Sequence, residues 1–178
     1  MNWKTYLTDS NRTLIDLGKS DNLIHAAIGI ATEIGELKEA YDDVNKKEEL
    51  GDIYWYMAIL WREMDLTWDS PFIETESTTI DFLSYAECLN ALDFYSKALL
   101  DQVKRVKFYS MPLENFKTEI IYEISIRLTH LLNRSEFQFE PILETNINKL
   151  RARFPDKFNS TDALHRDLEK ERKILTGN

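Results

Sequence analysis

Four carboxylates between residues 31 and 60 lie beside stretches that are otherwise apolar. Glu33 and Glu36 end one apolar run. Glu49 and Asp52 begin the next, and neither run contains a Lys or an Arg. Side chains three apart on an α-helix differ by about 60° around its axis, so each pair shares one helix face. Such carboxylates repel one another, and burying them without a counter-charge costs several kcal/mol each or forces protonation.

A divalent cation would remove this conflict between burial and repulsion. Oxygen ligands select hard cations, which favours Mg²⁺ first and Mn²⁺ as a substitute. A di-iron centre on helices uses Glu-x-x-His pairs, and neither acid pair here ends in His. A solvated helix face is the alternative interpretation of each pair. Gly35 and Gly51, one inside each pair, allow either close approach of a helix or ligand, or only helix packing.

Helical periodicity dominates the chain and predicts the elements that carry these residues. We expect a helix from Asp21 or Asn22 to about Tyr41, and a second from an Asn45 cap to about Met64. Because few residues join them, the two helices must pack antiparallel, which lets the acid pairs face each other. Further helices are expected at about 80–109, 113–132 and 141–154, with a short exposed helix in the tail. The fold class is all-α, an antiparallel bundle of about five long helices.

The composition excludes several classes of protein. The 178 residues suit one domain that can bury a full core. A net charge of −9 disfavours nucleic acid as a partner. No stretch approaches the roughly 20 apolar residues of a membrane span, and the few glycines form no phosphate-binding loop. The single Cys88 and the polar start of the chain favour the cytoplasm.

Two sequence blocks carry a resemblance to a known family. "EIGEL…EELGDIYWY" and "NINKLRARFPDKF" are similar to the motifs of the MazG-like all-α nucleoside triphosphate pyrophosphohydrolases. The resemblance implies a MazG-like bundle that converts NTP or dNTP to NMP or dNMP and pyrophosphate with Mg²⁺. It assigns metal binding and catalysis to Glu33, Glu36, Glu49 and Asp52. The second block would be a phosphate clamp, and Tyr56 a nucleotide contact or, alternatively, a core aromatic.

The second block offers three side chains for binding a substrate. Asn146, Lys149 and Arg153 fall at i, i+3 and i+7, on one helical stripe. A planar Arg fork and a Lys point charge suit a triphosphate, whereas a row of surface salt bridges is the alternative. His25, two turns before Glu33, is a further candidate substrate contact, although a lone His on an apolar helix is more often a core residue.

The remaining aromatic residues divide between core and site. Tyr54, Trp55 and Trp61 are expected in the core. Trp3 and Tyr6 are candidates for a wall against which a base stacks.

The chain departs from the compact family pattern in two places. Some members carry an additional Glu where this chain has Thr32, which leaves the general base open, with Glu33 as a candidate. Residues 70–138 also separate the two blocks widely, as extra helices do in the longer dimeric dUTPases of this superfamily. Within this insert, Glu119 and Glu123 fall near the positions that Glu49 and Asp52 occupy in the first hairpin, but with a different spacing. The insert is therefore either a degenerate second half without metal ligands or an ordinary helical hairpin.

The sequence thus predicts one domain with four parts. These are a catalytic hairpin at about 22–64, a helical insert at about 79–133, a phosphate-binding helix at about 141–154 and an exposed tail at about 160–178. Apolar hairpin faces favour a homodimer or a larger homo-oligomer. The choice among dUTP, dCTP, purine triphosphates and alarmones stays open. The alternatives in function are a non-catalytic nucleotide-sensing or helical interaction protein, and an alarmone (ppGpp-type) hydrolase.

Overall fold

The computed structural model describes residues 1–73, 83–159, 161, 165 and 167–177, which form seven α-helices and no β-strand. The helices are α1 (Trp3–Ser10), α2 (Lys19–Glu39), α3 (Asp43–Glu63), α4 (Tyr85–Phe108), α5 (Glu119–Arg134), α6 (Phe139–Arg153) and α8 (Leu168–Thr176), with the 3₁₀ helices η1 (Asn11–Thr13) and η3 (Leu113–Asn115). The all-α class is confirmed, with more helices than expected from the sequence. No helix of the described part is long and apolar enough to cross a membrane.

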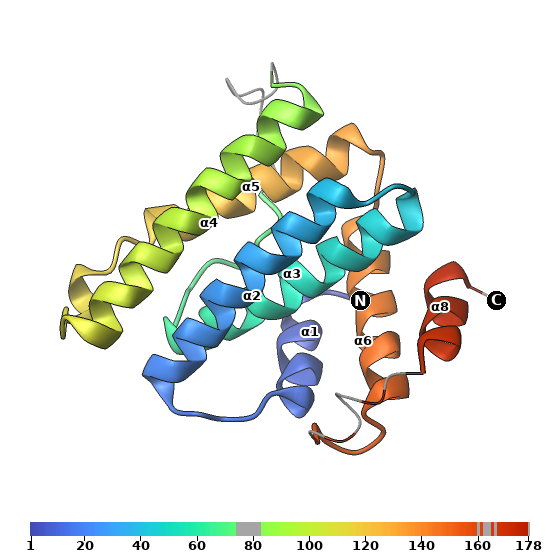
Figure 1. Cartoon of the computed structure of the whole chain (residues 1–178), viewed down its shortest axis with the longest axis horizontal. Coiled ribbons are helices and arrows are strands. Elements are labelled where there is room, and N and C mark those ends of the chain that lie inside the picture. Colours follow the sequence, from blue (N-terminus) through green and yellow to red (C-terminus); the bar gives the residue numbers. More distant parts are fainter. Residues whose placement is uncertain (74–82, 160, 162–164, 166, 178) are drawn as a thin grey trace.

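α2 and α3 form the expected hairpin and pack against each other (Figure 1). α2 begins at Lys19, ahead of the expected cap, because Gly18 adopts a positive φ of 84° and turns the chain into the helix. α3 begins at Asp43, since the Asp42 side chain accepts a hydrogen bond from the backbone N–H of Asn45 at 2.7 Å. The prediction that Asn45 is the cap was therefore wrong: it lies in the first turn, where Asp42 has already capped the helix.

α4 packs against α2, and α5 packs against α4 (Figure 1). Ser84 and Glu87 form a capping box that begins α4 at Tyr85. The start expected near residue 80 lies outside the described residues.

α5 begins later than the sequence suggested. The helix expected from Leu113 is only the short η3, and α5 itself begins at Glu119. Phe116 ends η3 in an extended conformation and is only 6% exposed. Burial of this ring in the core outweighs continuation of the helix through the segment.

α1 was not predicted, and it corrects the expectation for the first two aromatic residues. Trp3 and Tyr6 are 3% and 0% exposed. Their rings stack at 5.3 Å, and Trp3 also meets the Trp61 ring edge to face at 5.4 Å. They form part of the core and supply no wall for a base.

α6 and α8 complete the side of the molecule opposite α4 and α5. α6 packs against α3 and α1, and its Pro141 lies in the first turn, where a missing N–H costs nothing. α8 packs against α6 (Figure 1). Most of its side chains are exposed as expected, but Glu171 is only 4% exposed.

Candidate active site

A cavity of about 820 Å³ is lined by residues of α2, α3 and α6 and of the segments that precede α2 and follow α6. It contains seven of the nine side chains proposed from the sequence: Glu33, Glu36, Glu49, Asp52, His25, Tyr56 and Arg153. Asn146 and Lys149 are not among its lining residues. The hairpin therefore brings the two acid pairs together with one predicted cation from the second sequence block.

Three of the four acids form a tight cluster. Glu33 and Glu36 of α2 and Glu49 of α3 each offer a carboxylate oxygen, and these oxygens lie within 4.8 Å of one another. Glu33 and Glu49 are partly buried, whereas Glu36 is exposed. Asp52 lines the same cavity but lies outside this group of three.

The cluster is short of positive charge. Burial, followed by the charges of Asp52, Glu36 and Glu49, raises the pKa of Glu33 to about 8. Burial and the neighbouring carboxylates, Asp52 first, raise the pKa of Glu49 to about 7 despite the opposing effect of Lys149. These are the effects expected of like charges that share a partly desolvated site. The oxygen donors, their spacing and this deficit of positive charge all fit a hard divalent cation.

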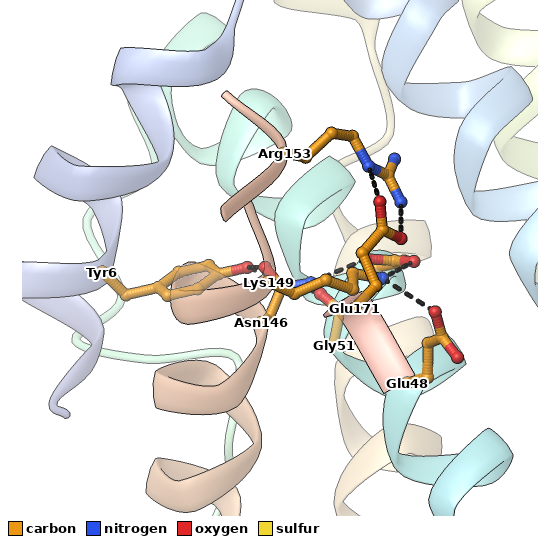
Figure 2. Close-up of polar contacts among 8 residues, drawn as sticks. Tyr6, Glu48, Gly51, Asn146, Lys149, Arg153 and Glu171 are labelled. Carbon is orange, nitrogen blue, oxygen red and sulfur yellow. Dashed lines mark hydrogen bonds and ion pairs between the residues drawn. The ribbon is translucent and has the colours of Figure 1, made fainter. Parts of the chain in front are cut away.

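Asp52 is hydrogen-bonded to a polar network that includes Tyr6, Asn146 and Lys149, which are labelled in Figure 2. Its Oδ2 accepts a hydrogen bond from Lys149 Nζ at 2.5 Å, and its Oδ1 accepts one from Asn146 Nδ2 at 2.7 Å. Tyr6 Oη donates to Asn146 Oδ1 at 2.7 Å, and Lys149 Nζ also reaches Glu48 Oε1 at 3.3 Å. Burial alone would lower the pKa of Lys149, but the charges of Asp52 and Glu48 outweigh it and raise that pKa.

This network corrects the expected roles of two residues. Asn146 and Lys149 are only 3% and 1% exposed, so both side chains are buried beneath Asp52 and do not face the cavity. Two members of the predicted stripe, Asn146 and Lys149, therefore contact Asp52 of the hairpin. Gly51 permits this approach of α6, since a Cβ there would lie 3.0 Å from the Cβ of Asn146.

Arg153 is the member of the stripe that reaches the cavity. It makes a bidentate ion pair with Glu171 of α8, with Nε to Oε1 at 2.8 Å and Nη2 to Oε2 at 2.5 Å (Figure 2). Sequence reasoning missed Glu171, because the pair joins positions 18 residues apart across Pro155.

Aromatic side chains line another part of the cavity. The His25 ring meets those of Trp55 and Tyr56 edge to face, at 5.8 and 5.4 Å. Trp55, expected in the core, packs against the core and also lines the cavity, and its Nε1 donates to Thr13 Oγ1 at 3.0 Å. Because Trp55 lies three residues after Asp52 on one helix, the two side chains share a face, so the sequence could have indicated that Trp55 lies beside the site. Burial lowers the pKa of His25, which favours the neutral imidazole.

Two further aromatic residues of the cavity were not predicted from the sequence. Phe154 and Phe158 line the cavity with ring centroids 5.1 Å apart. Ile15, Leu17 and Ile24 add apolar surface. The lining of the cavity thus combines carboxylates with aromatic and aliphatic side chains.

Comparisons of the chain with family models, with curated proteins and with solved structures found no match. The resemblance to the MazG-like family therefore rests on the two sequence blocks alone.

Proposed function

We propose that this protein is a Mg²⁺-dependent nucleoside triphosphate pyrophosphohydrolase, which converts NTP or dNTP to the monophosphate and pyrophosphate. The observation that carries the proposal is a single cavity whose lining combines six carboxylates, the four proposed metal ligands among them, with one arginine and several aromatic side chains. Its volume of about 820 Å³ lies within the range typical of small-molecule sites. A nucleotide likewise combines charged phosphates with an aromatic base.

Glu33, Glu36, Glu49 and Asp52 would hold the metal. When bound, Mg²⁺ (or Mn²⁺) would polarise phosphoryl oxygens and lower the pKa of water. The clustering of three carboxylates within 4.8 Å supports this assignment. Hydrogen bonds from Lys149 and Asn146 orient the Asp52 carboxylate before a metal binds.

The side chains of the cavity divide the remaining work. Arg153 would bind phosphate oxygens and offset the charge that develops on the pyrophosphate. Glu33 is our candidate to accept the proton of the attacking water. Thr32 cannot take this role, because a neutral hydroxyl is far too weak a base to accept that proton. Trp55 and Phe158 would pack against the base and exclude water.

The proposal extends to the whole molecule. We infer a single MazG-like domain in which the hairpin of α4 and α5 is a second half without metal ligands. We also infer a cytoplasmic homodimer or larger homo-oligomer. Large exposed apolar side chains are available for contacts in such an oligomer: Ile28 is 51%, Phe94 65% and Tyr41 82% exposed.

A panel of NTPs, dNTPs and alarmones with Mg²⁺, scored for monophosphate and pyrophosphate, tests the activity. We expect hydrolysis of at least one triphosphate and its loss in Glu36→Gln, with Glu169→Gln, at an exposed position of α8, as the control. Tight binding without turnover would favour a nucleotide sensor. Turnover of alarmones alone would change the substrate and keep the chemistry.

A further inference from the structure

We infer that Glu171 of α8 is a positioning residue that orients the Arg153 guanidinium toward a phosphate in the cavity. This inference rests on the proposed function and names a part of the site that lies outside both sequence blocks. It makes the C-terminal helix a component of the site.

The geometry of the ion pair assigns the two edges of the guanidinium. Glu171 engages Nε and Nη2, at 2.8 and 2.5 Å. Arg153 lines the cavity, whereas Glu171 does not. A guanidinium is planar with five donors in a rigid fork, so an arginine held along one edge still presents Nη1 for binding an anion.

The carboxylate that holds Arg153 is itself held in place. The Glu171 and Arg153 side chains are 5% and 17% exposed. On either side of Glu171 along α8, Lys170 Nζ donates to the Ala152 carbonyl at 3.4 Å, and Arg172 pairs with Asp42 at 3.0 Å. These contacts attach α8 to α6 and to the start of α3, so Glu171 occupies a defined position relative to the hairpin.

Orientation is favoured over competition for the arginine. Because Glu171 is buried, withdrawing the guanidinium from it would cost much more than it would at the surface. A phosphate therefore gains more by binding the remaining edge than by displacing the carboxylate. An arginine already fixed in one rotamer also loses less conformational entropy on binding.

The first experiment measures the orientation without any ligand. In a ¹⁵N NMR spectrum we expect a sharp, exchange-protected Nε–Hε cross-peak for Arg153, assigned by its loss in Arg153→Lys. Glu171→Gln should broaden or shift it, and Glu171→Asp should have an intermediate effect. Glu169→Gln is the matched control, since Glu169 lies on the same helix with its side chain 82% exposed.

The second experiment measures binding of inorganic tripolyphosphate with Mg²⁺ by calorimetry. Glu171→Gln should weaken binding about 10-fold, the size typical when a supporting hydrogen-bond partner of a site is removed. In an Arg153→Ala background the same substitution should change nothing further, because Glu171 acts through Arg153. Melting temperatures identify variants that fail to fold, for which Glu171→Asp replaces Glu171→Gln.

The outcomes separate this inference from the proposed function. If Arg153→Ala weakens binding but Glu171→Gln does not, the positioning role is overturned and the proposed function stands. Tighter binding by Glu171→Gln would mean that Glu171 competes with phosphate, and additive effects in the double mutant would mean a structural role only; each overturns the inference. A wild type that binds no tripolyphosphate would overturn both.

Discussion

The carboxyl of Glu33 is both partly buried and close to other carboxylates. Its pKa in the metal-free protein is about 8, against an ordinary value of 4.5, first because of burial and then because of neighbouring carboxylates. The native protein therefore retains a proton that the unfolded chain has released. The stability that follows is fully present below about pH 4.5 and is lost as the pH rises to about 8.

This linkage gives a prediction for the metal-free protein. In EDTA, the free energy of unfolding should fall between pH 5 and pH 8.5, and Glu33→Gln, which is neutral throughout, should reduce the fall by about 1–2 kcal/mol. The effect is limited to this size because solvent at the partly exposed site screens the repulsion among the carboxylates. Urea unfolding at both pH values measures it, with Glu169→Gln as a control for loss of a surface charge. Equal falls in Glu33→Gln and wild type would contradict the raised pKa.

The second prediction concerns Lys149: because its side chain is buried, we expect its substitution to lower the stability of the fold. Lys149→Met removes the cation from Asp52 in a poorly solvated setting and should lower the free energy of unfolding by roughly 2–4 kcal/mol. Lys4→Met, at an exposed position of α1, should be nearly neutral. Asp52→Asn should destabilise as well, since it leaves the Lys149 ammonium buried without its counter-charge. A fully stable Lys149→Met that binds tripolyphosphate poorly would instead support a direct phosphate contact.

At the scale of the elements, two glycines of α2 differ in what surrounds them. A Cβ at Gly29 would lie 2.2 Å from the Tyr56 ring, whereas a Cβ at Gly35 would meet nothing within 4 Å. Gly29 thus lets a cavity aromatic of α3 pack directly onto α2.

The third prediction compares alanine at these two positions. Gly35→Ala should stabilise the protein by about 0.5–1 kcal/mol, because alanine is the better helix former and no atom must move. Gly29→Ala should destabilise it by roughly 1–3 kcal/mol, because Tyr56 must leave its place. Thermal unfolding measures both. Similar effects of the two substitutions would mean that Tyr56 does not pack against α2 as described.

The fourth prediction concerns the hairpin of α4 and α5. Glu123 pairs with Arg127 four residues later on α5, and neither Glu119 nor Glu123 lines the cavity. Glu119→Gln and Glu123→Gln should therefore change kcat/KM by less than about 2-fold, whereas Glu36→Gln should lower kcat by about 100-fold. Steady-state release of pyrophosphate measures all three. A large loss in either α5 variant with the fold intact would place a catalytic group in this hairpin.

How far the sequence predicts these elements depends on whether their signals are local. The α2–α3 hairpin followed from the helical period and a short connection. The pairing of Asp52 with Lys149 did not, because no local pattern tells whether a helical stripe faces solvent or a buried carboxylate. The capping of α3 by Asp42 could have been found, since Asp is as good a cap as Asn and occurs earlier. The contact of Arg153 with Glu171 depends on how the chain returns after Pro155, and no periodicity encodes that return.

At the scale of the whole molecule, the negative net charge means that both added salt and a bound divalent cation should stabilise the fold. The chain carries a net charge of −9, and part of that charge is concentrated on one hairpin. Any salt therefore stabilises the fold by screening, whereas a bound divalent cation stabilises it through a specific site. A test for the metal must separate the two effects.

The last prediction makes that separation. Mg²⁺ at ten times its Kd should stabilise the folded state by about 1.4 kcal/mol, which raises Tm by about 3–6 °C for a chain of this size. NaCl at equal ionic strength should raise it less, and Glu36→Gln should respond to both salts alike, while Glu169→Gln keeps the wild-type response. Because Mg²⁺ must displace the protons that Glu33 and Glu49 retain, its Kd should be lower at pH 8, so a fixed Mg²⁺ concentration should raise Tm more at pH 8 than at pH 6. A wild type that responds equally to MgCl₂, MnCl₂ and NaCl at pH 8 would contradict a metal site in this cavity.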